Sequence, residues 1–167
     1  MKRIWAPWRL EYIKAEKSKG CFLCEKLKEN KDEKNYILFR GKESFIVLNL
    51  YPYNNGHLMV APYRHIGNLE DLKEVEMLDI MQNIKLSVKI LKKAFNPDGF
   101  NIGLNIGAAS GAGLVDHIHF HIVPRWHGDT NFMPVLADIK IIPQSLDLTY
   151  KELKKILSEL QYPSLSL

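Results

Sequence analysis

Three histidines at alternate positions are the residues best suited to chemistry in this sequence. His117, His119 and His121 are three of the six histidines among 167 residues. Because side chains two apart in a β-strand point to the same face, a strand would align these imidazoles and turn the apolar residues between them toward a core. Crowded imidazoles repel when charged, so some must stay neutral and exchange hydrogen bonds, which can leave one ring nitrogen free as a nucleophile. A metal site and an exposed strand that carries histidines by accident are the alternatives.

A loop of small residues precedes the three histidines. Residues 107–113 read Gly-Ala-Ala-Ser-Gly-Ala-Gly, and a chain with so few side chains lets backbone N–H groups approach an anion closely. The spacing matches neither the dinucleotide fingerprint nor the Walker pattern, so an ordinary flexible turn is the alternative. The position just before the histidines favours an anion-binding loop.

The two cysteines of the chain lie in one Cys-x-x-Cys motif, Cys21 to Cys24. This spacing suits zinc, although no second Cys-x-x-Cys and no compact histidine pair follows to complete a zinc knuckle. A thioredoxin-like redox motif would need a β-α-β context, which the surrounding pattern lacks. Three interpretations stay open: a zinc site completed by distant histidines, a redox pair, and two unrelated thiols.

The composition is that of an ordinary globular domain, with 46% hydrophobic and 25% charged residues. No apolar run approaches the ~20 residues that a membrane-spanning helix needs, and Met1 opens a basic, Trp-containing stretch rather than a signal peptide. We therefore expect a soluble cytoplasmic protein with no membrane partner. The net charge of +4, without a long basic block, suits a small anionic ligand and is too weak to argue for nucleic acid.

Hydrophobic periodicity predicts the elements that position these residues. Strands are predicted at residues 36–40, 44–50, 57–61, 100–105 and 117–124. One long helix is predicted from Glu70 to Phe95, and its buried stripe would consist of Leu72, Val75, Leu78, Met81, Ile84, Val88 and Leu91. The sequence Asn-Pro-Asp-Gly at 96–99 would end that helix.

Shorter helical segments are predicted toward both ends of the chain. They cover residues 5–13 and a C-terminal helix that a capping box at 149–152 would open and that would end near Leu160. The charged stretch at 25–34 is interpreted as either solvated surface or a short helix. The predicted fold class is α+β, a five-stranded antiparallel sheet with one long helix packed on it plus N- and C-terminal helical segments. We expect one domain over residues 1–167, with a core at about 20–130 and a C-terminal extension at about 131–167.

The run from His117 to Val123 fits the pattern His-φ-His-φ-His-φ-φ, in which φ is an apolar residue. The sequence therefore resembles the histidine-triad (HIT) family of nucleotide hydrolases and transferases. Residues 49–57, which end in Gly56-His57, and the dipeptide after the run, Pro124-Arg125, resemble the same family. Residues 116–134, and residues 5–9 followed by the Cys-x-x-Cys motif, look like the branch that cleaves diadenosine tetraphosphate by phosphorolysis.

This resemblance implies a HIT-like fold and a role for each histidine. His119 would attack the α-phosphorus of a nucleotide and form a covalent nucleotidyl-histidine intermediate, which water or phosphate would release. His57 and His121 would orient the nucleophile, and His117 would belong both to the active site and to a metal site. The residues implied in substrate binding are Asn49 at the ribose and Asn105, Ser110, Gly111 and Gly113 at the phosphates.

One departure from the family pattern bears on the reaction. Hydrolase members carry a polar Gln or Ser just before the three histidines, where this chain has Gly113-Leu114. The missing side chain favours a transferase over a hydrolase.

Zinc-bearing relatives imply the metal ligands and the partners. The ligands would be Cys21, Cys24, His65 and His117, holding a structural zinc ion with no organic cofactor. The resemblance also implies a homodimer that acts on a nucleotide. Other functions stay open: a nucleoside phosphoramidase or general nucleotide hydrolase, a non-catalytic nucleotide-binding module, and a zinc-dependent interaction protein. His127 is expected to be a surface residue.

Overall fold

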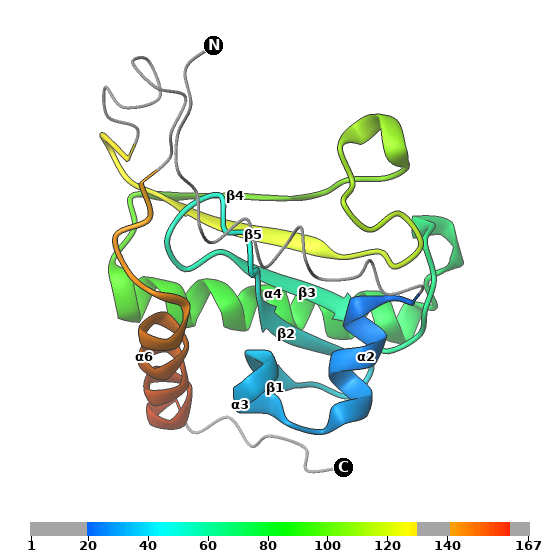
Figure 1. Ribbon diagram of the computed structural model, residues 1–167, viewed down its shortest axis with the longest axis horizontal. Helices are drawn as coiled ribbons and strands as arrows, with labels where there is room; N and C mark the ends of the chain where they lie inside the picture. The colour runs from blue at the N-terminus through cyan, green and yellow to red at the C-terminus, as the bar shows by residue number, and fades with distance from the viewer. Residues whose placement is uncertain (1–19, 130–140, 161–167) are drawn as a thin grey trace.

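The structure of the protein is a computed structural model that describes residues 20–129 and 141–160 (Figure 1). Its helices and strands are α2 (Phe22–Glu29), α3 (Asp32–Asn35), β1 (Ile37–Arg40), β2 (Ser44–Leu48), β3 (Leu58–Pro62), α4 (Glu74–Phe95), β4 (Gly99–Leu104), β5 (Phe120–Arg125) and α6 (Leu146–Glu159). The α+β class is confirmed. The helix predicted over residues 5–13 lies outside the described residues. None of the helices in the described ranges is long and apolar enough to cross a membrane.

The strands form one five-stranded antiparallel sheet in the order β1-β2-β3-β5-β4. The first three strands are a meander, as predicted, and β5 lies between β3 and the edge strand β4. In the β3–β5 pair, Leu58 lies opposite Ile122 and Met59 lies opposite His121. This register brings His57, the residue just before β3, close to the third of the alternate histidines.

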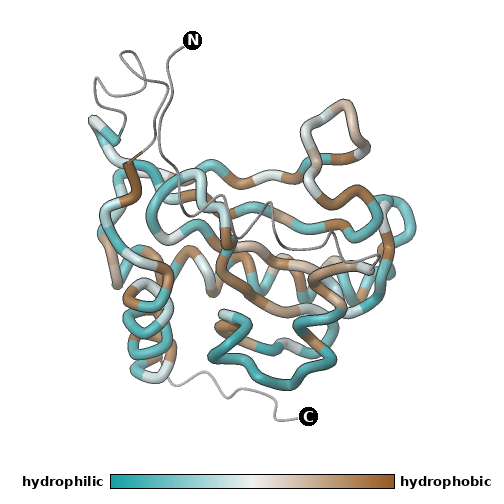
Figure 2. The backbone as a smooth tube through the Cα atoms, viewed as in Figure 1, coloured by the Kyte–Doolittle hydropathy of each residue, from teal (hydrophilic) through white to brown (hydrophobic). Residues whose placement is uncertain are grey.

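Two hydrophobic clusters cover the two faces of the sheet, because residues along a strand alternate between faces. Along β2, Ile46 points into the larger cluster beneath α4 and α6, whereas Phe45 points into a smaller cluster that includes Leu23 of α2. Figure 2 shows the hydrophobic stretches concentrated in the central strands, while the α2–α3 segment is largely hydrophilic. Helix α6 contributes three residues to the larger cluster, Tyr150, Leu153 and Leu157, so the core continues past residue 130.

The stripe predicted for the long helix is partly wrong. Ile84 and Leu91 are buried as expected, but Val75, Leu78 and Met81 are 57%, 62% and 55% exposed. The buried face of α4 instead includes polar residues, namely Glu76, Asp79, Asn83 and Ser87. Counting apolar residues misplaced the face, because buried polar side chains with hydrogen-bonding partners carry no hydrophobic signal.

Asp79 shows why a polar residue occupies the inner face of α4. Its carboxylate accepts hydrogen bonds from the backbone N–H groups of Lys42 and Glu43 and from the Ser44 hydroxyl, the last at 2.6 Å. Two of these donors lie in the turn between β1 and β2, and the third is on the first residue of β2. The carboxylate therefore fixes that hairpin to the helix, and its burial is offset by the bonds it accepts.

Several predicted boundaries were also wrong. The long helix begins at Glu74, after a short 3₁₀ turn at Leu69–Asp71, rather than at residue 70. The C-terminal helix begins at Leu146, because the Ser145 side chain caps it by accepting from the Leu148 N–H. The predicted capping box at Thr149 lies inside this helix. Strand β5 begins only at Phe120, so two of the three alternate histidines precede the strand.

Candidate active site and metal site

The three alternate histidines lie on one extended segment that leads into β5. His117, His119 and His121 are 0%, 6% and 9% exposed, so the aligned imidazoles are buried. Ile118 and Ile122, which alternate with the histidines, belong to the core beneath α4, as the period of two predicts. The Ile118 N–H donates to the Ile66 carbonyl at 2.6 Å, and this bond holds the segment to the chain after β3 in place of sheet pairing.

The ring of His119 has a defined tautomer. Its Nδ1 lies 2.9 Å from the backbone carbonyl oxygen of His117. A carbonyl oxygen only accepts, so Nδ1 must carry a proton, and the lone pair of the neutral ring is on Nε2. The neighbouring ring of His121 lies with its centroid 4.9 Å away. The hydrogen bond thus makes Nε2 the ring nitrogen that can act as a nucleophile when His119 is neutral.

The bond from His119 to the His117 carbonyl is one line of hydrogen bonds. A second line, from the Tyr53 N–H through His57 to His121, fixes the tautomers of His57 and His121. The Tyr53 N–H donates to His57 Nδ1 at 3.1 Å, so the proton of a neutral His57 is on Nε2. His57 Nε2 lies 2.9 Å from His121 Nδ1 and donates to it. The proton of His121 is therefore on Nε2, where it is available to a substrate oxygen.

Burial keeps this histidine pair neutral. It lowers the pKa of His57 to about 3, and repulsion from His121 and His119 adds to the effect. Burial likewise lowers the pKa of His121 to about 4, again with a contribution from His119. Near pH 7 both rings are neutral, so the tautomers derived from the hydrogen bonds describe the working state.

The small-residue loop follows β4 and projects from the body of the molecule (Figure 1). Gly107 and Gly111 have positive φ angles of 75° and 84°, which disfavour any residue with a side chain. A Cβ atom at Gly107, Gly111 or Gly113 would meet nothing within 4 Å. The Ser110 hydroxyl donates to the Gly107 carbonyl at 2.7 Å. In the described residues, no hydrogen bond joins this loop to the histidines.

Two asparagines singled out from the sequence lie at the ends of strands. The Asn49 Oδ1 accepts from the Tyr51 N–H at 2.9 Å, and its Nδ2 lies 3.2 Å from His57 Nδ1. Asn49 thus supports the turn that places His57, and it remains partly exposed. Asn105 follows the last residue of β4 and is also partly exposed.

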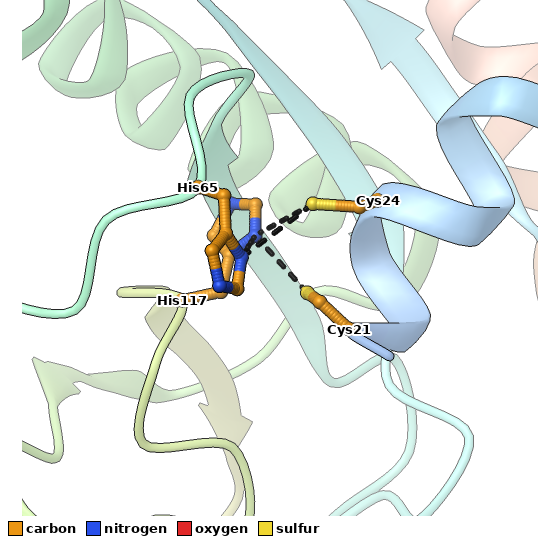
Figure 3. A group of neighbouring side chains, drawn as sticks. All are labelled: Cys21, Cys24, His65 and His117. Atoms are coloured by element: carbon orange, nitrogen blue, oxygen red, sulfur yellow. Dashed lines mark hydrogen bonds between the residues drawn. The ribbon is translucent and has the colours of Figure 1, made fainter. Parts of the chain in front are cut away.

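The two cysteines meet two histidines at the start of α2 (Figure 3). Ligand atoms of Cys21, Cys24, His65 and His117 all lie within 4.8 Å of one another. The His117 Nδ1 is 3.2 Å from Cys21 Sγ and 3.4 Å from Cys24 Sγ, and the two histidine Nδ1 atoms are 3.4 Å apart. Side chains from three separate parts of the sequence therefore converge on one point.

These distances fit a tetrahedral ion. Zinc bonds of about 2.3 Å to sulfur and about 2.0–2.1 Å to nitrogen separate sulfur from nitrogen by roughly 3.6 Å and nitrogen from nitrogen by roughly 3.4 Å. His117 Nε2 lies 2.9 Å from the Pro62 carbonyl and must donate to it, so Nδ1 presents a lone pair to the cysteines. Burial lowers the pKa of His117, which favours the neutral ring that a metal requires.

Sequence reasoning missed the backbone groups that set the histidine tautomers. The Tyr53 N–H and the Pro62 and His117 carbonyls each fix one ring. Residue types do not reveal which main-chain groups will bind a side chain, because almost every residue carries the same main-chain donor and acceptor. The expectation for His127 is confirmed, because its side chain is 95% exposed and pairs with Asp98 at 3.0 Å.

Comparison with known proteins identifies the family. The HIT domain matches residues 30–128 of this chain. The protein belongs to the HIT domain family, and the resemblance drawn from the three histidines is confirmed.

Two curated relatives and one solved structure illustrate the match. The AP-4-A phosphorylase of Mycobacterium tuberculosis is 39% identical over 154 residues, which cover 87% of this chain and 79% of the relative. The asymmetrical bis(5'-nucleosyl)-tetraphosphatase of Schizosaccharomyces pombe is 31% identical over 71% of this chain and 58% of the relative. Both names are those of enzymes. A zinc-bound histidine triad family protein of Mycobacterium smegmatis shares the fold, with a TM-score of 0.68 and 22% identity over 84% of this chain and 95% of that one.

The neutral state of His57 and His121 predicts a pH-dependent stability. Their folded pKa values of about 3 and about 4 lie below the unfolded value near 6.5, so the unfolded chain binds protons that the folded protein excludes. The contribution of these rings to the free energy of unfolding is fully present above about pH 6.5. It falls as the pH drops toward 4, by up to about 1.4 kcal/mol per pH unit for each ring. Urea unfolding between about pH 7 and pH 5 measures this loss.

The comparison uses two variants. His57→Gln should lose less stability with falling pH than the wild type, because its unfolded chain has one histidine fewer to bind a proton that the folded protein excludes. His127→Gln replaces an exposed histidine and should keep the wild-type slope. Equal slopes in all three proteins would contradict the prediction.

Proposed function

We propose that this protein cleaves dinucleoside polyphosphates such as diadenosine tetraphosphate, with His119 as the nucleophile. The observation that carries the proposal is the 2.9 Å bond from His119 Nδ1 to the His117 carbonyl, which leaves Nε2 with its lone pair. The two curated relatives, named for AP-4-A and for nucleosyl tetraphosphates, support this class of substrate.

In the first step, His119 Nε2 attacks the α-phosphorus of the substrate. A P–N bond forms while the P–O bond to the rest of the polyphosphate breaks, so ATP leaves and an adenylyl group remains on the histidine. The Nε2–H of His121 donates to a phosphate oxygen as charge develops there. Such a reaction depends mainly on positioning and charge stabilisation, which the two buried hydrogen-bond lines supply.

In the second step, inorganic phosphate is the proposed acceptor. Its oxygen attacks the adenylyl group, the P–N bond breaks, and ADP is released with His119 returned to its starting state. Water in the same place would release AMP. The Gly113-Leu114 sequence favours phosphate, because the polar side chain that hydrolase members carry there is absent.

The substrate-binding residues remain those implied by the sequence. We assign the phosphates to Asn105 and the small-residue loop, through Ser110, Gly111 and Gly113, and the ribose to Asn49. The open space around the loop glycines supports this assignment, since a phosphate can approach the backbone N–H groups without meeting side chains.

Product analysis with diadenosine tetraphosphate tests the reaction. With inorganic phosphate the products should be ATP and ADP, and without it ATP and AMP at a lower rate. His119→Asn should lower the turnover number by several orders of magnitude in either condition, because no other group replaces the nucleophile.

His127→Asn is the matched control and should keep wild-type turnover. Substrate cleavage that never yields ADP would remove the phosphorolysis assignment. Activity on nucleoside phosphoramidates alone would identify the phosphoramidase alternative. Full activity of His119→Asn would instead indicate that the protein does not use this nucleophile.

We also propose that Cys21, Cys24, His65 and His117 hold a structural zinc ion. Four protein ligands complete a tetrahedron and leave no open position for a substrate, so the ion would join the start of α2 to the histidine segment. The convergence of the four ligand atoms supports this site, and the related M. smegmatis protein is described as zinc-bound. A reducing compartment such as the cytoplasm would keep both thiols available.

Metal analysis of protein purified without chelator tests the zinc proposal. We expect about one zinc per chain in the wild type and much less in His65→Ala, with a lower melting temperature, because metal binding is coupled to folding. His127→Ala is the control and should retain the metal. Wild-type protein that contains no zinc would exclude a resident structural ion.

We further propose that two copies of the chain associate. Exposed apolar side chains on α4, including Val75, Leu78 and Met81, and the edge strand β4 with its exposed Ile102 offer surfaces for a second copy.

Light scattering tests the association. It should report twice the chain mass of 19.3 kDa. Leu78→Glu should shift the protein toward the monomer, while Lys85→Glu, an exposed position on the same helix, is the control. A wild-type mass of one chain would contradict the dimer.

A further inference from the structure

Tyr53 contacts both histidines of the second hydrogen-bond line. Its ring centroid lies 4.6 Å from that of His57 and 5.5 Å from that of His121. The tyrosine is 55% exposed, whereas the two histidines are 1% and 9% exposed. The aromatic ring therefore lies between the imidazole pair and the solvent.

We propose that Tyr53 is a positioning residue, whose ring covers the His57–His121 pair and holds His121 Nε2–H in place beside His119. The inference rests on the proposed function, in which that N–H donates to the substrate phosphate. The backbone N–H of the same residue fixes the His57 tautomer. One residue thus sets the direction of the hydrogen-bond line and restricts the rotation of both rings.

Covering the pair also contributes to the low pKa of both rings. The titratable groups that face the two rings are His119 and the phenol of Tyr53 itself. Among the described residues, no carboxylate, lysine or arginine contributes to the pKa of either ring. Burial is the largest cause of both lowered pKa values, so removing the ring would admit water and raise them. The hydrogen bond from the Tyr53 N–H to His57 Nδ1 would then be lost at a higher pH than in the wild type, because a protonated ring cannot accept it.

The contacts that matter come from the ring, not from the hydroxyl group, and this distinction gives the test. Tyr53→Ala removes the cover but keeps the backbone N–H. Tyr53→Phe keeps both. Tyr53→Leu keeps an apolar side chain and serves as the second variant if the alanine variant does not fold.

The experiment combines kinetics on diadenosine tetraphosphate with an NMR titration of the histidine ring protons made without substrate. For Tyr53→Ala we expect kcat to fall about 10- to 100-fold with little change in KM, because misplaced groups lower the rate of the chemical step. The titration of His57 and His121 should move upward by about one pH unit. Tyr53→Phe should keep the wild-type kcat and titration. Tyr53→Leu should give values of both between those of Tyr53→Ala and Tyr53→Phe.

The outcomes separate this inference from the proposed function. If the wild type does not cleave the substrate, the proposed function fails, while the titration still tests the cover. If Tyr53→Ala, or Tyr53→Leu in its place, keeps wild-type kcat and titration, the inference is wrong. A rise in KM alone would also overturn it, because the ring would then bind substrate instead of positioning the histidines.

Discussion

The structure of both candidate sites depends on how one residue, His117, is held. Its ring donates through Nε2 to the Pro62 carbonyl and turns Nδ1 toward the two cysteines, while its backbone carbonyl accepts from His119. A shift of this residue would displace both a proposed metal ligand and the carbonyl that orients the proposed nucleophile, His119. Its complete burial and the Ile118–Ile66 hydrogen bond next to it restrict such a shift.

The sheet supplies the second constraint, because the β3–β5 register places His57 beside His121. A one-residue slip would move His121 to the face covered by α4. The alternation of Ile118 and Ile122 with the histidines opposes such a slip, since both isoleucines are buried in the main core. Hydrophobic burial on one face thus fixes the geometry of the polar groups on the other.

Local periodicity predicted the strands and the long helix. It failed for the buried face of α4 and the start of β5, which depend on contacts with distant parts of the chain. The period of two correctly put the three histidines on one face, and five strands were recognised. The buried face of α4 was misplaced because Glu76 and Asp79 are buried by virtue of their partners Arg64 and the β1–β2 turn. The start of β5 was misplaced because the Ile118 N–H binds the Ile66 carbonyl, in the chain after β3, instead of a sheet neighbour.

The sequence predicted which residues form the candidate sites, but it could not predict which ring nitrogens carry protons. The Cys-x-x-Cys motif and the three histidines predicted the groups that converge, and the family resemblance supplied His57 and His65. The tautomers depend on main-chain partners that only the fold reveals.

Two separate hydrogen-bond lines end at adjacent imidazoles. One line ends at a ring nitrogen that can accept a proton, and the other ends at a ring nitrogen that can donate one. The line from the His117 carbonyl leaves His119 with a lone pair, whereas the line from the Tyr53 N–H leaves His121 with a proton. A substitution at phosphorus needs both an electron pair to attack and a donor for the oxygen that gains charge. Because hydrogen bonds from the backbone set each tautomer, neighbouring histidines can differ in function without differing in residue type.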